Sequence, residues 1–412
     1  MIAAMTTLSI LTSSFLIALS CGIASQSKGH SPDLAEQAIS PDQSVALKAQ
    51  DQLRLNGPKG LELLQQRFAN EIAQHRSGAP SDARWKRIGA ALDHVSGQYD
   101  DYSSGLFWYT DLEKAKAAAR ASGRPIVSLR LLGHLDEDLS CANSRFFRTT
   151  LYPNAEISRL LKDHFILHWE SVRPAPRITI DFGDGRKLER TITGNSIHYI
   201  LDADGQVMDA LPGLYSAPVF IAELQQTLTA AKENRPDGTG NYAQQMNTTY
   251  GRLVNSWADD LAKFNVAAPA GKARGERALE QLTDDQMWQQ IASLHASPVK
   301  FDGRVRELMA RKFPDAATAA PLAVSKSAIE VPMLRALPAL NNSIALDTVR
   351  NNYMLRARIL AFLSSPETKS LSLHQINDWV YAVVFLTPKD DPWLGLAPPN
   401  VFAALDGNGE SQ

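Results

Sequence analysis

The spacing of apolar residues predicts helices toward both ends of the chain and a mixed region of helices and strands between them. Near the N-terminal end, apolar side chains recur at helical intervals, as at Leu64, Phe68 and Ile72, so that they share one helix face. Three helices are expected here, over residues 44–55, 61–74 and 82–95. We interpret residues 44–97 as a small helical cap, with Ser44 available to cap the first helix.

The central region, residues 105–233, alternates helical spacing with short apolar runs. An alanine-rich helix is expected to end at Gly123, with Pro125 just beyond, because glycine and proline terminate helices. Ile126–Leu132 follows as a mostly apolar strand of a buried sheet, and Asn154 is placed to cap a later helix. Further elements are expected over residues 165–169, a strand, and 217–232, a closing helix.

Two pairs of strand-like segments in this region flank turn sequences. Residues 177–182 and 186–192 surround Gly183-Asp184-Gly185, and residues 197–201 and 206–210 surround Asp202-Ala203-Asp204-Gly205. Short turns rich in glycine and aspartate between such segments are typical of β-hairpins. We therefore expect two hairpins here.

The remainder of the chain is mostly helical. Residues 234–240 are rich in glycine, proline and polar residues and predict a linker. Residues 242–387 carry helical patterns and are interpreted as a helical domain, followed by an irregular tail over residues 388–412. The predicted fold class is α/β, with a helical N-terminal cap, a central domain and a helical C-terminal domain.

Composition limits the classes of function. The chain has 412 residues, 44% hydrophobic residues and a net charge of −2, which is ordinary for a globular protein of more than one domain. The absence of a basic excess argues against nucleic acid as a partner. The four histidines of the central region match no metal-ligand spacing, so no metal and no cofactor is predicted.

The N-terminus carries an apolar run over residues 8–19, followed by small residues. This pattern predicts a signal peptide over residues 1–24, although its first residues include no lysine or arginine; the alternative is a buried N-terminal helix. A flexible tether over residues 25–43 would follow. The mature chain would then be exported, periplasmic or extracellular, without an integral membrane span. Lipid anchoring through Cys21 is the less favoured alternative.

Cys141 is the single cysteine left after removal of such a signal peptide. It precedes an expected helix, where free N–H groups and Arg145 would stabilise a thiolate. Acidic residues at 136–138 would disfavour the anion. From these residues alone, a buried structural cysteine and a reactive thiol remain equally open.

The order of elements from Trp108 to Lys232 resembles the thioredoxin-like superfamily, in its secreted bacterial type. The matching features are a helix and strand leading to Cys141, the strand at 165–167 and Ser196 before the second hairpin. In that family a second cysteine and a proline complete the redox site, and here Ser144 and Ser196 occupy those places. The resemblance implies a thioredoxin-like central domain that cannot close an internal disulfide.

Two functions follow from this resemblance. The favoured one is a non-catalytic scaffold or partner-binding protein whose partner is another exported protein. The other is a monothiol redox protein, in which Cys141 reacts and Asn143 and Ser144 support its thiolate. Ser196 and Arg145 are the candidate binding residues.

Overall fold

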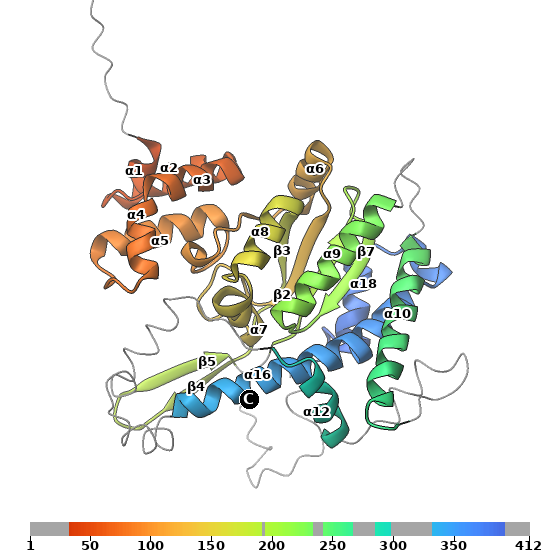
Figure 1. The fold of residues 1–412 in the computed structure, drawn as a ribbon. Helices are drawn as coiled ribbons and strands as arrows, with labels where there is room; N and C mark the ends of the chain where they lie inside the picture. The colour runs from red at the N-terminus through yellow and green to blue at the C-terminus, as the bar shows by residue number, and fades with distance from the viewer. Residues whose placement is uncertain (1–32, 192–193, 234–241, 267–284, 298–331, 392–412) are drawn as a thin grey trace, which may run out of the picture. The chain divides into compact units, whose positions relative to one another are not determined.

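The structure is a computed structural model that describes residues 33–191, 194–233, 242–266, 285–297 and 332–391 (Figure 1). The predicted signal peptide, the predicted linker and residues 392–412 of the predicted tail lie outside the described residues. Within the described part, the protein has a mixed α/β fold in which helices flank a five-stranded sheet.

Five helices form the N-terminal part and bury a core of aliphatic residues around Phe68. They are α1 (Leu34–Gln37), α2 (Gln43–Leu55), α3 (Pro58–Arg67), α4 (Ala69–Arg76) and α5 (Ala83–Ser96). The helices predicted over residues 44–55 and 82–95 are confirmed. Asp42, and not Ser44, caps α2, because its carboxylate accepts hydrogen bonds from the backbone N–H groups of Ser44 and Val45.

Two sequence-based expectations for this part were wrong. Residues 61–74 do not form one helix, because Phe68 leaves helical geometry (φ −109°, ψ 25°) and separates α3 from α4. The expected tether, residues 25–43, is also wrong for residues 34–43, which are folded. Ala38 is fully buried, and its carbonyl accepts a hydrogen bond from the Gln50 side chain at 2.7 Å. Because α1 and the residues after it are buried against their neighbours, residues 34–43 belong to the folded N-terminal part.

The central sheet has the strand order β1-β3-β2-β6-β7. Its strands are β1 (Trp108–Tyr109), β2 (Ile126–Leu132), β3 (Ile166–Arg173), β6 (Ser196–Leu201) and β7 (Val207–Pro212). β1, β3 and β2 are mutually parallel, whereas β6 runs antiparallel to both β2 and β7. The strands predicted at 126–132 and 165–169 and the hairpin at 197–210 are confirmed, while the two-residue β1 was not expected.

Helices connect and cover these strands. They are α6 (Leu112–Ser122), α7 (Ala142–Phe146), α8 (Ala155–His164) and α9 (Ala217–Glu233). The predicted stop at Gly123 is confirmed, since this glycine closes α6 at φ +68°. Asn154 caps α8 as predicted, accepting hydrogen bonds from the N–H groups of Glu156 and Ile157.

The two faces of the sheet are covered by different parts of the chain. Adjacent residues of β6 show this, because their side chains point to opposite faces. His198 contacts Tyr152 and Phe220, the latter from α9. Tyr199 instead donates a hydrogen bond to Asn377, which lies in a C-terminal helix. The C-terminal helices therefore complete the core of the sheet.

The described C-terminal helices are α10 (Tyr242–Ala262), α12 (Asp285–Leu294), α16 (Pro332–Arg350), α17 (Ala357–Leu363) and α18 (Leu373–Trp379). Ile359, Leu360 and Val380 join the same hydrophobic core as the central strands. Trp257 and Trp288 belong to a separate cluster. In the described part of the chain, no helix is both long enough and apolar enough to cross a membrane.

Three π-helical turns bring large polar side chains into the interior. They are η2 (Phe147–Leu151), η3 (Asn351–Arg356) and η5 (Val380–Val384). Each contains a buried polar residue, respectively Arg148, Arg356 and Tyr381. Because π-helical turns are rare and often occur at functional sites, the surroundings of these three residues are candidate functional sites.

The remaining strands, β4 (Arg177–Asp181) and β5 (Lys187–Thr191), form a separate two-stranded antiparallel sheet (Figure 1). The hairpin predicted over residues 177–192 is confirmed. Gly183 and Gly185 both have positive φ angles, of +76° and +89°, which only glycine adopts without strain. The turn glycines thus explain why the sequence signal was reliable here.

Candidate functional site

Cys141 lies at the N-cap of α7, at the end of the loop that follows β2. Its backbone N–H donates to the Leu132 carbonyl at 3.4 Å, and its Sγ accepts a hydrogen bond from the Ser144 N–H at 3.4 Å. The side chain is fully buried, with 0% of its surface exposed. Cys141 therefore lies at a helix start, as predicted, and its side chain is completely excluded from solvent.

Burial dominates the acid–base behaviour of this thiol. Removal from water disfavours the thiolate and raises the pKa of Cys141 above its ordinary value. Hydrogen bonds from Ser144, Leu132 and Asn143 oppose this shift without cancelling it. Of the two interpretations that the sequence left open, burial matches the structural cysteine, because a buried neutral thiol is less reactive than an exposed thiolate.

The structure brings Asn143 and Ser196 into direct contact. The Asn143 amide donates to the Ser196 hydroxyl at 2.9 Å, and both side chains are buried. Gly194 permits this approach, because a Cβ at that position would lie 2.7 Å from the Asn143 side-chain oxygen. Two residues predicted from separate parts of the sequence thus meet beside Cys141.

Ser144 is engaged in local hydrogen bonds. Its hydroxyl donates to the Cys141 carbonyl at 3.1 Å and forms a hydrogen bond with the Ser140 hydroxyl. The Ser140 side chain also accepts a hydrogen bond from Arg148, and its carbonyl accepts one from Thr191. We call Ser140, Cys141, Asn143, Ser144 and Ser196 the thiol cluster.

The proposed influence of Arg145 on the Cys141 thiol stays a prediction. Arg145 is only partly buried, and the main influences on the Cys141 pKa are burial and hydrogen bonds from its neighbours. Arg148 is the buried arginine of this region, and its guanidinium donates to the Asp138 carbonyl and to Ser140. Sequence spacing indicated a nearby arginine but did not show which one would face inward.

A C-terminal segment contacts the loop that leads into Ser196. Tyr381 donates through its hydroxyl to the Asn195 carbonyl at 3.0 Å, and the Asn195 amide donates to the Thr387 hydroxyl at 3.2 Å. Arg173 donates to the carbonyls of Thr387 and Pro388. Burial raises the pKa of Tyr381 well above its ordinary value, and Cys141 contributes to the same shift. The segment 381–388 therefore contacts Asn195, the residue before Ser196 of the thiol cluster, a contact that the sequence did not predict.

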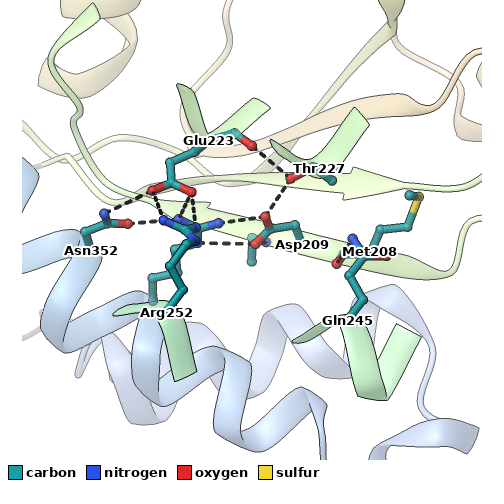
Figure 2. Close-up of polar contacts among 9 residues, drawn as sticks. Met208, Asp209, Glu223, Thr227, Gln245, Arg252 and Asn352 are labelled. Atoms are coloured by element: carbon teal, nitrogen blue, oxygen red, sulfur yellow. Dashed lines mark hydrogen bonds and ion pairs between the residues drawn. The ribbon is translucent and has the colours of Figure 1, made fainter. Parts of the chain in front are cut away.

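A second buried polar cluster joins β7, α9, α10 and η3. The Arg356 guanidinium binds Asp209 (Nη2···Oδ2 2.7 Å) and Glu223 (Nη1···Oε2 2.7 Å). Arg252 makes two hydrogen bonds to Glu223, at 3.1 and 2.5 Å. Figure 2 shows Thr227 bonded to Asp209 and Asn352 bonded to Glu223. We call Asp209, Glu223, Arg252 and Arg356 the charged cluster.

The charges of this cluster balance one another. Burial alone would raise the pKa of Glu223, but Arg356 and Arg252 lower it to about 2. Burial likewise works to lower the pKa of Arg356, yet Asp209 and Glu223 hold it above its ordinary value. Glu223 and Arg356 are thus ionised, and ion pairs join Arg356 to Asp209 and to Glu223 and join Arg252 to Glu223. Pairing of this kind is the condition under which buried charges are tolerated. The arrangement favours a structural role over acid–base chemistry.

Sequence reasoning did not identify the charged cluster. A usable signal existed, since Asp209 and Arg356 each interrupt an apolar stretch, at Met208-Asp209-Ala210 and Leu355-Arg356-Ala357. A charge at such a position needs a buried partner. The sequence could not show that these two residues, 147 positions apart, bind each other.

Two of the histidines of the central region are buried on opposite faces of the sheet. His168 bonds to Ser128 through Nδ1 at 2.9 Å, and His198 bonds to Tyr152 through Nε2 at 2.7 Å. Burial lowers the pKa of each to about 3, so both are neutral. Among the described residues, no group of three histidine, cysteine, aspartate or glutamate side chains is arranged to hold a metal ion.

Comparisons with protein-family models, with curated proteins and with solved structures find no match for this chain.

Proposed function

We propose that this chain is an exported thioredoxin-like protein that acts as a non-catalytic scaffold or binds another exported protein. The observation that carries the proposal is the complete burial of Cys141 together with a serine at the position of a resolving cysteine. A thiol must reach its partner as a thiolate to exchange disulfides. Burial keeps the Cys141 thiol from reaching a partner, and Ser144 cannot resolve a mixed disulfide. Both features therefore argue against catalysis.

The order of strands and helices supports the thioredoxin-like part of the proposal. β1, α6 and β2 lead to Cys141 at the start of α7, and β3 follows after α8. The antiparallel pair β6–β7 and α9 then close the sheet on its other side. This is the order of elements on which the resemblance of residues 108–232 to the superfamily rests.

Two contacts support a non-catalytic role. Ser196 stands where the family has its proline, and its hydroxyl accepts a hydrogen bond from Asn143. This residue therefore holds the loop to α7. Tyr381 and Thr387 bind Asn195, the residue before it. A peptide that approached this loop would first have to displace the segment 381–388.

Thiol labelling of the native protein tests the proposal. A maleimide probe should modify Cys141 at least about a hundredfold more slowly in buffer than in denaturant, because labelling then requires opening of the structure. If the protein used retains residues 1–24, Cys21 should be replaced by serine so that Cys141 is the only thiol labelled. The double variant C141A/A142C provides the matched control, since Ala142 is exposed on the same helix turn and its cysteine should react rapidly.

The same measurement decides the alternative function. Fast labelling of native Cys141 would contradict the scaffold proposal and support a monothiol protein that forms mixed disulfides with an external thiol. Catalytic reduction of protein disulfides, in which the chain turns over without an external resolving thiol, would contradict both proposals. Ser144 cannot provide the second sulfur for such a reaction.

Export is proposed from the apolar run at residues 8–19 and is tested separately. Expressed in a bacterium with a secretion system, the protein should lose about two dozen residues and leave the cytoplasm. Intact-mass analysis of the exported fraction measures this loss. A mass that retains Met1 would contradict the proposal, and a lipid on Cys21 would support the anchored alternative.

A further inference from the structure

The β4–β5 hairpin exposes an apolar row that the rest of the described chain does not cover. Ile178, Ile180 and Phe182 retain 39%, 43% and 53% of their surface. A two-stranded hairpin is marginally stable on its own, and additional strands stabilise it. Exposed apolar residues beside a strand edge without a partner are typical of a surface that pairs with another strand.

The backbone of β4 has one free edge. The Phe182 N–H donates to the Arg186 carbonyl at 3.1 Å, so the backbone groups of the even-numbered residues of β4 face β5. Because successive backbone groups in a strand point to opposite sides, those of Arg177, Thr179 and Asp181 face outward. In the described part of the chain, no strand other than β5 pairs with β4.

We propose that the outer edge of β4 pairs antiparallel with β4 of a second copy of this chain, about a twofold axis at Thr179. Thr179 would exchange backbone hydrogen bonds with the partner's Thr179. Arg177 would lie opposite the partner's Asp181, and Ile178 opposite the partner's Ile180. The result is a four-stranded sheet that uses the outward-facing backbone groups of both copies.

Charge complementarity selects this register. At each end of the pairing, the guanidinium of one copy lies opposite the carboxylate of the other, and opposite charges across neighbouring strands are stabilising. A shift by two residues would place Arg177 opposite Thr179 and lose the charge pairs. In the single copy, Arg177 makes an exposed ion pair with Glu137 at 3.6 Å, and Asp181 makes one with Lys187 at 3.3 Å and accepts a hydrogen bond from the Gly183 N–H at 2.9 Å. Exposed ion pairs contribute little to stability, so both side chains keep groups that can pair with a second copy.

The other edge of the hairpin does not offer the same fit. Self-pairing of β5 about Glu189 would bring two carboxylates opposite each other, which is unfavourable. Thr191, at the end of β5, is buried and donates to the Ser140 carbonyl at 2.8 Å. The β4 edge is therefore the one that fits a second copy, and the isologous contact closes as a dimer.

Sedimentation equilibrium of the full chain over a range of concentrations tests the proposal, and the wild type should form a dimer. Thr179→Pro removes an outward N–H without removing a bond to β5, and a proline is tolerated at a strand edge. It should raise the dimer Kd about tenfold or more. Glu189→Pro is the matched control, because it changes the equivalent position on the outer edge of β5, and its Kd should stay that of the wild type.

A charge exchange provides a second test. Arg177→Asp and Asp181→Arg should each raise the dimer Kd on the order of tenfold, since like charges would then face each other. The double variant R177D/D181R should restore the wild-type Kd, and an equimolar mixture of the two single variants should form heterodimers. Circular dichroism and thermal unfolding establish that each variant is folded.

Three outcomes would overturn the proposal: a monomer at every concentration, a dimer whose Kd does not change in Thr179→Pro and the charge variants, or open-ended assembly. The pairing uses no residue of the thiol cluster. A negative result in the dimer test therefore says nothing against the proposed function. A negative result in the labelling test likewise says nothing against the dimer.

Discussion

The thiol cluster and the charged cluster are both buried and polar, yet they are held together differently. The charged cluster relies on ionised pairs between distant segments, such as Arg356 with Asp209. The thiol cluster relies on hydrogen bonds between neutral groups, such as Asn143 with Ser196. A buried charge without its counterion costs several kcal/mol, whereas a neutral group without its partner costs about 1–3 kcal/mol.

This difference separates two tasks within the same core. The charged cluster fastens η3 and α10 to the edge of the sheet, so its loss should weaken the whole described C-terminal part. The thiol cluster positions one loop and one helix start, so its loss should be local. Removing single residues from each cluster measures whether this comparison holds.

The largest effect is expected for Arg356→Met. Because this change leaves Asp209 and Glu223 buried without their shared counterion, it should lower the free energy of unfolding by about 3–5 kcal/mol. Urea unfolding followed by circular dichroism measures the change. Arg358→Met is the control, since Arg358 is exposed two positions further along and should cost less than about 0.5 kcal/mol. Equal effects of the two variants would refute the structural role of the charged cluster.

Acid should weaken the charged cluster selectively. The pKa of Glu223 is lowered to about 2 from an ordinary 4.5, so the unfolded chain takes up the proton first. The stability that this group contributes is complete above pH 4.5 and is lost as the pH falls toward 2. At about 1.4 kcal/mol per pKa unit, the contribution is about 3 kcal/mol.

Unfolding free energies of the wild type and Glu223→Gln between pH 7 and pH 3 check this expectation. The difference between the two proteins should narrow as the pH falls. The corresponding difference for Cys141→Ser should stay constant over this range, because the pKa of Cys141 is raised and the thiol remains protonated throughout. A constant difference for Glu223→Gln would contradict the lowered pKa.

A smaller effect is expected in the thiol cluster. Asn143→Ala should lower the free energy of unfolding by about 1–3 kcal/mol, because the Ser196 hydroxyl loses its buried partner. A double-mutant cycle with Ser196→Ala measures the interaction itself. The combined variant should cost less than the sum of the single variants. Strict additivity would show that this hydrogen bond does not hold the loop to α7.

The smallest effect is expected for Arg145→Glu. Because Arg145 is only partly buried and burial dominates the Cys141 pKa, the free energy of unfolding should change by less than about 0.5 kcal/mol. The maleimide labelling rate of native Cys141 should also stay unchanged. A slower reaction in this variant would show that Arg145 stabilises a thiolate, as the sequence suggested.

Local signals predicted much of the fold. The helix stop at Gly123, the cap at Asn154 and the β4–β5 turn depend on residues within a few positions of one another. The break at Phe68 was missed, because helical spacing continues through it and the deviation depends on how that ring packs in its core. The same distinction applies to the site, where the neighbours of Cys141 along the chain were found and the segment 381–388 was not.

The sequence by itself determined that Cys141 is the only cysteine after position 21 and that a serine, Ser144, stands three positions further on. It also predicted a helix start at Cys141, which the structure confirms. Only the tertiary structure decided that the thiol is buried. Cys141 belongs to a hydrophobic core that includes Tyr381, which is distant in the sequence. An apolar sheet face is buried against another element of the fold. Local sequence spacing does not specify which distant segment provides that element.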